Sequence, residues 1–169
     1  ETDHRPHFFG GVATIVTKLL LQVLPDVAVF GEKDYQQLQV ISRLTHDLDI
    51  PVKIIGGPTI READGLAMSS RNAYLSEEDR RIAPILNVTL KAAGHEALAG
   101  NDTSQTEAKA ARKLLEAGFA RVDYVAIRHA QSLAPLTSAD IKAGQPVRVL
   151  GAAILGETRL IDNLDPRSS

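Results

Sequence analysis

The spacing of apolar residues over the first third of the chain predicts a helix followed by a strand–helix–strand unit. Apolar side chains recur every three or four residues over 11–24, which indicates an amphipathic helix that ends at Pro25. The short apolar run over 27–30 predicts a strand buried on both faces. A helical pattern over 34–47 and another apolar run over 52–55 follow, so we expect two parallel strands joined by a right-handed crossover.

The rest of the chain predicts a different architecture, in which helices precede an antiparallel sheet. Ser76 and the acidic residues after it form a helix-start signal, Ser104 is a second expected cap, and 156–157 is an expected two-residue hairpin turn. The fold class is therefore α/β followed by α+β. The expected elements are helices over 76–98 and 105–117 and strands over 122–127, 146–155 and 158–164.

Between these two parts lies the segment 56–75, which has no sustained period and holds three glycines and one proline. This pattern predicts a loop at a domain boundary, with domains over 1–62 and 63–169. A loop of this length inside a compact protein is usually functional or disordered.

Composition excludes several classes of function. The 169 residues are 44% hydrophobic and 24% charged, which is typical of a globular chain with a buried core. The absence of cysteine excludes disulfides and thiol catalysis and is compatible with a cytoplasmic location. The net charge is −2 without a run of Lys or Arg, so no nucleic-acid partner is expected. No apolar stretch is long enough to cross a bilayer, so no membrane partner is expected either.

The first candidate site follows the strand over 27–30, where a parallel strand ends and a helix begins. In open α/β sheets, ligands bind at this edge. Gly31 would let a ligand approach the backbone, Lys33 supplies a cation suited to phosphate, and the helix N-terminus favours an anion. Gln37 adds a side chain that both donates and accepts hydrogen bonds. The alternative is a polar turn with a solvated Lys33–Asp34 pair.

The second candidate site lies inside the segment 56–75. Ser69, Ser70 and Arg71 place two hydroxyls beside a planar fork of guanidinium donors, which suits a phosphate or carboxylate. A glycine-bearing loop between domains could close over such a ligand. The alternative is a flexible linker with a polar turn.

A third set of polar residues stands near the start of the chain. Asp3, His4 and His7 are residue types that bind metals, but Pro6 argues against a helix that would align both histidines on one face. A disordered end or a tag remnant is the preferred interpretation, and no metal site formed by protein residues is predicted.

The segments 31–37 and 58–75 together resemble the pantothenate synthetase (pantoate–β-alanine ligase) family. Arg5-Pro6 with Gly11-Val12 and the segment 159–163 resemble further parts of that family, so the resemblance covers essentially the whole chain. It implies the end of a Rossmann-like nucleotidylyltransferase domain followed by a smaller α+β domain that acts as a lid. It also implies a cytoplasmic homodimer.

The resemblance implies an ATP-dependent ligase. In this family, pantoate and Mg-ATP give pantoyl adenylate and pyrophosphate, and β-alanine then displaces AMP to form pantothenate. ATP and Mg²⁺ are the implied cofactors, and pantoate and β-alanine the implied substrates. Lys33, Ser69, Ser70 and Arg71 would be catalytic, and Gln37 and Arg5 would hold pantoate. The implied ATP-binding residues are Gly31, Lys33, Asp34, Ile60, Met68, Ser69, Ser70 and Arg71.

The chain departs from the family pattern in two places. A family segment with two histidines in a His-x-Gly-His arrangement is absent, so we expect an N-terminal segment of the same protein as a partner. Over 5–12, Phe8 stands where the family has His and Gly10 where it has Arg. Two other functions stay open: a non-catalytic nucleotide-binding or interaction domain, and a related nucleotidylyltransferase. A His-x-Gly-His segment in the full gene product would favour an enzyme.

Overall fold

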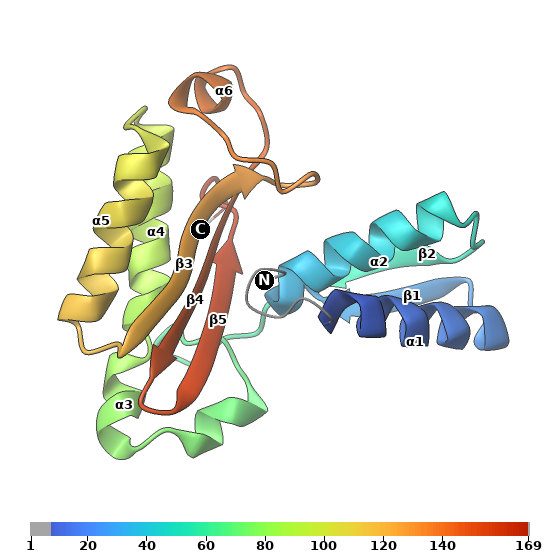
Figure 1. Ribbon diagram of the computed structural model, residues 1–169, viewed down its shortest axis with the longest axis horizontal. Coiled ribbons are helices and arrows are strands. Elements are labelled where there is room, and N and C mark those ends of the chain that lie inside the picture. Colours follow the sequence, from blue (N-terminus) through green and yellow to red (C-terminus); the bar gives the residue numbers. More distant parts are fainter. Residues whose placement is uncertain (1–7, 169) are drawn as a thin grey trace. The chain divides into compact units, whose positions relative to one another are not determined.

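The computed structural model describes residues 8–168 and divides the chain into two compact units, which meet in sequence at Thr59 and Ile60 (Figure 1). The elements of unit 1 are α1 (Phe8–Val23), β1 (Val27–Gly31), the 3₁₀ turn η1 (Glu32–Asp34), α2 (Tyr35–Asp47) and β2 (Lys53–Gly57). Those of unit 2 are η2 (Ser70–Tyr74), α3 (Glu77–Ile82), α4 (Ile85–Leu98), α5 (Thr103–Glu116), β3 (Arg121–His129), α6 (Ser138–Lys142), β4 (Val147–Leu155) and β5 (Thr158–Leu164). The predicted α/β half followed by an α+β half is confirmed.

Unit 1 is the predicted strand–helix–strand unit, with β1 and β2 paired in parallel. Its small core forms where Leu20 of α1 packs with Ile50 and Val52 and is joined by Ala28 of β1. Successive side chains of a strand point to opposite faces, and the face opposite Ala28 carries Val29, which is 66% exposed. The prediction that β1 is buried on both faces is therefore wrong for the described residues, because α1 and α2 pack on the face of Ala28.

Helix α1 begins at Phe8, three residues before the predicted start. Gly10 and Gly11 lie inside it, and a glycine in a helix interior lowers helix propensity without forbidding the helix. The helix ends where predicted, because Leu24 adopts a positive φ of 46° immediately before Pro25.

Unit 2 is an antiparallel sheet in the order β3-β4-β5, with α4 and α5 lying side by side along one face (Figure 1). Large apolar residues from the helices and strands fill the space between the two layers. The predicted hairpin at 156–157 is confirmed, because Leu155 pairs with Thr158 and Gly156 adopts a φ of 56°. The side chains buried most completely in this core include Leu86, Leu90, Leu114, Ile127, Val149 and Leu155.

Three details of unit 2 differ from the sequence prediction. The helix expected over 76–98 is two helices, because Pro84 lacks the amide hydrogen that a continuous helix needs. Asp102 rather than Ser104 caps α5, since its carboxylate accepts a hydrogen bond from the amide of Gln105 at 2.8 Å. The short helix α6 was not predicted; Thr137 and Asp140 form its capping box.

Close packing at Gly151 gives a stability prediction. A Cβ added there would lie 2.8 Å from Cδ2 of Leu90 and 3.3 Å from Cδ1 of Leu86, and both leucines are buried. Gly151→Ala should therefore lower the free energy of unfolding by about 1–3 kcal/mol, measured by urea denaturation. Gly11→Ala is the control, because a Cβ there would meet no atom within 4 Å and alanine favours a helix interior, so the free energy of unfolding should not fall. An unchanged urea midpoint for Gly151→Ala would contradict the packing described.

Candidate functional site

The first candidate site lies at the carboxyl edge of the parallel strand pair in unit 1. The pairing sets Gly31 opposite Gly57, so both strands end at the same edge. The chain passes directly from Gly31 into η1, which holds Lys33 and Asp34, and then into α2, whose first turn holds Gln37. One strand-to-helix connection therefore brings together the four unit 1 residues predicted for this site.

The backbone at this edge is open to a ligand. Gly31 has an ordinary φ of −66°, and a Cβ there would meet no atom within 4 Å. Neither backbone conformation nor packing within the described residues requires a glycine at this position, and the missing side chain leaves the backbone open to close approach. Asp34, at the start of α2, makes no capping hydrogen bond through its side chain. The side chain of Asp34 therefore does not cap the helix end, whose partial positive charge favours an anion.

The second candidate site lies in unit 2, on a short hairpin rather than on the irregular loop that was predicted. The anchored hairpin is residues 60–68, in which Arg61 and Ala67 form an antiparallel bridge. The amide of Glu62 donates to the carbonyl of Leu66 at 2.8 Å. Gly65 turns the chain with a φ of 90°, and Leu66 belongs to the buried core. The hairpin is therefore a fixed part of unit 2.

The predicted nucleotide-binding residues of unit 2 lie at the end of this hairpin. Ile60 and Met68 stand opposite each other, because the amide of Met68 donates to the carbonyl of Ile60 at 2.9 Å. Their side chains are 63% and 50% exposed. Ser69 caps η2 by accepting a hydrogen bond from the amide of Arg71 at 3.2 Å. Ser70 and Arg71 are exposed, so an apolar pair borders exposed hydroxyl and guanidinium donors.

A partly buried ion pair joins the anchored hairpin to β5. The guanidinium of Arg61 donates to both carboxylate oxygens of Asp162, at 2.8 and 3.0 Å. The Asp162 side chain is only 3% exposed and also accepts hydrogen bonds from the Asn87 side chain and the Asn163 amide. Arg61 additionally donates to the carbonyl of Gly65 at 3.0 Å. The sequence prediction gave no role to Arg61 or Asp162, although both lie in the segments 58–75 and 159–163 that resemble the family.

A second, exposed ion pair stands at the tip of the hairpin. Arg80 of α3 donates to the carboxylate of Asp64, and the amide of Leu66 donates to the other oxygen of the same group. The hydrogen bond from Arg80, followed by that from Leu66, holds the pKa of Asp64 below its usual value. The carboxylate is therefore ionised at neutral pH and tethers the tip to α3.

The structure assembles each set of predicted residues within its own unit: Gly31 to Gln37 in unit 1, and Ile60 to Arg71 in unit 2. Arg5, predicted to hold pantoate, and Asp3, His4 and His7 lie outside the described residues. Over 8–168, no group of three or more His, Asp or Glu side chains could hold a metal ion. None of the helices in that range is long and apolar enough to cross a bilayer.

Comparison with known proteins gives one family. The family model described as Pantoate-beta-alanine ligase matches residues 1–165. A pantothenate synthetase from Rhodopseudomonas palustris (strain HaA2) is 57% identical over 164 residues, which cover 97% of this chain and 56% of that protein. The chain thus spans about half the length of the curated relatives it matches.

Solved structures agree with this match. A pantothenate synthetase from Thermus thermophilus superposes with a TM-score of 0.85 and 44% identity, over 98% of this chain and 59% of that one. A pantoate-beta-alanine ligase from Francisella tularensis, complexed with Beta-gamma ATP and Beta-alanine, gives a TM-score of 0.71 and 32% identity. That match covers 99% of this chain and 54% of the other.

Proposed function

This chain belongs to the pantoate-beta-alanine ligase family, and from that premise we propose that it is part of an enzyme that makes pantothenate from pantoate, β-alanine and ATP. In the first step, a pantoate carboxylate oxygen attacks the α-phosphorus of ATP and pyrophosphate leaves, giving pantoyl adenylate. In the second, the β-alanine amine attacks the acyl carbon, AMP leaves and the amine loses a proton.

The observation that carries the proposal is that the part of the chain matched by the family model holds two features suited to anions, one in each unit. Unit 1 offers Lys33 beside an N-terminus of α2 without a side-chain cap, and unit 2 offers Ser69, Ser70 and Arg71 at the end of a fixed hairpin. The Francisella relative, which is 32% identical, is described as binding an ATP compound and β-alanine. Both features suit the phosphates of ATP.

The chemistry assigns each residue a task. Pantoate is already ionised at neutral pH, so the first step needs no general base. Its barrier comes from bringing two anions together and stabilising charge that develops on the phosphates, which cations and aligned amides do well. Lys33 and Arg71 would supply the cations, with Ser69 and Ser70 donating to phosphate oxygens. Gln37 would hold pantoate.

The remaining contacts follow the same division. Gly31 and Asp34 would line the nucleotide site, and Ile60 and Met68 would lie against the adenine, whose flat apolar faces suit an exposed aliphatic pair. Arg5 would contact pantoate.

Mg²⁺ fits this site as an ion carried by the nucleotide. Protein cages for Mg²⁺ are uncommon; substrate phosphates and one or two carboxylates usually hold it. The exposed Asp34 carboxylate lies at the edge where phosphates would bind. The ion would offset negative charge on the phosphates.

The proposal also covers the roles of the two units, the oligomeric state and the cellular location. Unit 1, residues 1–59, would complete a nucleotide-binding domain together with an N-terminal segment of the same protein, and unit 2, residues 60–169, would form its lid. The relatives' greater length supports the first statement. We also propose that the enzyme is a homodimer in the cytoplasm.

The proposal is tested on a complemented enzyme, defined as this chain supplied with the part of the Rhodopseudomonas palustris relative that it does not match. The assay measures AMP released from pantoate, β-alanine and Mg-ATP. β-Alanine-dependent AMP release is the expected result. Nucleotide binding without turnover would favour a binding module, and transfer of a nucleotide without amide formation would favour a nucleotidylyltransferase.

Amide exchange provides a second prediction, because the hairpin is hydrogen-bonded and several residues after it, Ser70 and Arg71 among them, are exposed. In the complemented enzyme, the amides of Glu62 and Met68, which are hydrogen-bonded in the hairpin, should exchange slowly even without ATP. The amides over 69–75 should exchange more slowly once Mg-ATP is added. Equal exchange over 69–75 with and without Mg-ATP would mean that this segment does not grip the nucleotide.

A further inference from the structure

We propose that Arg61 and Asp162 are positioning residues, which hold the anchored hairpin so that Ser69, Ser70 and Arg71 are preset to receive ATP phosphates. This inference rests on the proposed function, since it assigns a task to residues that do not touch the nucleotide. It concerns unit 2 alone.

The first step of the inference is the number of directed contacts on one guanidinium. Arg61 donates to both oxygens of Asp162, to the carbonyl of Gly65 at 3.0 Å and to the carbonyl of Asn163 at 3.3 Å. The first three contacts join the turn of the hairpin to the middle of β5. A planar guanidinium that satisfies four acceptors has its orientation fixed along with theirs.

The second step is the rigidity of the acceptor. Asp162 is buried, and its oxygens also accept hydrogen bonds from the Asn87 side chain at 3.0 Å and the Asn163 amide at 2.7 Å. Asn87 belongs to α4, so the carboxylate is held from the helix layer as well as from its own strand. The anchor point of the hairpin therefore belongs to the core of unit 2.

The third step is the short path from the anchor to the exposed donors. Arg61 bridges to Ala67, and the carbonyl of Ala67 accepts a hydrogen bond from the Asn72 side chain at 3.2 Å. Ser69 and Arg71 lie between Ala67 and Asn72 in the chain, and Ser69 caps the turn η2 that follows it. A shift of Arg61 would thus move Ala67 and Asn72, which lie on either side of the segment 69–71 that we propose binds phosphate.

Stability alone does not explain such a pair. Buried ion pairs can often be replaced by apolar residues without loss of stability, because removing two charges from water is costly. Their best-attested use is to specify one geometry among several. A fixed geometry matters here because catalytic groups misplaced by about 1 Å can cost about 100-fold in rate.

The test uses Arg61→Met in the complemented enzyme, with each half-reaction measured separately. Adenylation is followed as kcat/KM for ATP by pyrophosphate release, and the second step by single-turnover attack of β-alanine on supplied pantoyl adenylate. We expect kcat/KM for ATP to fall by about 10- to 100-fold. The second step, which does not use the β- and γ-phosphates, should fall at least about tenfold less than the first.

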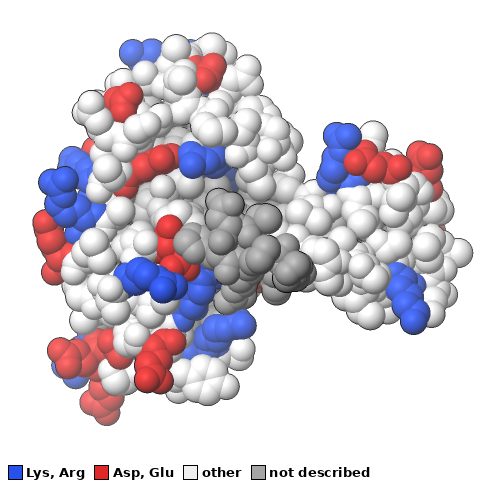
Figure 2. Space-filling view, in the orientation of Figure 1, with Lys and Arg blue, Asp and Glu red and all other residues white. Residues whose placement is uncertain are grey.

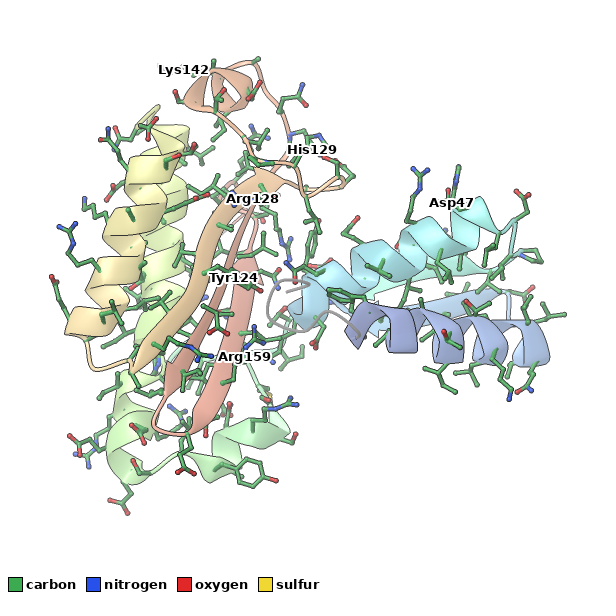
Figure 3. All side chains as sticks on the ribbon, viewed as in Figure 1. Asp47, Tyr124, Arg128, His129, Lys142 and Arg159 are labelled. Carbon is green, nitrogen blue, oxygen red and sulfur yellow. The ribbon has the colours of Figure 1, made fainter. Side chains whose placement is uncertain are left out.

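Arg128→Met is the matched control. Arg128 of β3 (Figure 3) pairs with Glu107 of α5 at 2.6 Å, and it is 28% exposed compared with 25% for Arg61. Ile127 and Arg128 of β3 both donate to Glu107 of α5, away from the hairpin. The control should keep kcat/KM for ATP within about twofold, as substitutions away from a site usually do.

If Arg61→Met does not fold, Arg61→Lys replaces it, since lysine keeps the charge but cannot satisfy Asp162 and Gly65 as a planar fork does. It should give a smaller fall in kcat/KM for ATP with the second step preserved. The positioning role is overturned if a folded Arg61 variant keeps kcat/KM for ATP, if Arg128→Met loses as much, or if both half-reactions fall equally. An inactive parent enzyme would overturn the proposed function itself, which separates the two failures.

Discussion

Replacing Lys33 with alanine in the complemented enzyme should slow pyrophosphate release from ATP and pantoate by about 100-fold or more, the scale for losing one charge-stabilising group. The reason is its place in the fold. Lys33 stands in η1, between the carboxyl end of β1 and the N-terminus of α2, where a bound anion would meet its cation and the helix amides together. Pyrophosphate release in the presence of saturating substrates is the measurement.

Lys53→Ala is the control for this experiment. Lys53 is also in unit 1, but it is the first residue of β2 and pairs with Val27, at the opposite end of the strands from Gly31. Its removal changes the net charge equally and should leave the rate within about twofold. Near-normal pyrophosphate release by Lys33→Ala would remove Lys33 from the catalytic residues.

The 169-residue chain by itself should make no measurable pantothenate and should self-associate. Unit 1 leaves many apolar side chains exposed, and much of its visible surface in Figure 2 carries no charge. Two parallel strands with open edges and an exposed apolar face tend to associate with another chain. The exposed apolar side chains of unit 1 include Ile15, Leu19, Val23, Val27 and Val29.

Two measurements check this prediction. Sedimentation velocity at several protein concentrations should show mass that rises with concentration, and the AMP assay should show no β-alanine-dependent product. Addition of the unmatched part of the Rhodopseudomonas palustris relative as a separate chain should restore some activity and reduce self-association. Robust turnover by the 169 residues as a well-behaved monomer would show that the exposed face needs no cover and that the site needs no further residues.

Local pattern was sufficient to predict most of the fold. The period of apolar residues located both strands of unit 1 and all three strands of unit 2, and the rule for the edge of parallel sheets located Gly31 and Lys33. Two of the errors arose because one local sequence signal overrode another. Pro84 interrupted a helical period that otherwise continued, and Asp102 provided a cap two residues before the predicted one.

The geometry of the anchored hairpin could not be predicted from local sequence patterns, for a different reason. Its fixed geometry depends on Arg61 and Asp162, which are 101 residues apart in the chain. The segment 56–75 has the composition of an irregular loop, and the contacts of Arg61 with Asp162 and Asn163 add to the local hydrogen bonds of the hairpin. The sequence therefore identified Ser69, Ser70 and Arg71 as candidates but not the residues that we propose hold them in place.

The long sequence separation of that pair bears on how this protein can be recombined with its relatives. A crossover point anywhere between 62 and 161 takes the guanidinium from one parent and the carboxylate with its Asn163 neighbour from the other. Hybrids from such crossovers should keep the segment 69–71 in place only when the two parents position these groups identically. A transfer of residues 60–71 into a relative therefore requires that residues 162–163 and Asn87 be transferred as well. The residues to be exchanged are defined by their contacts and not by their continuity in the sequence.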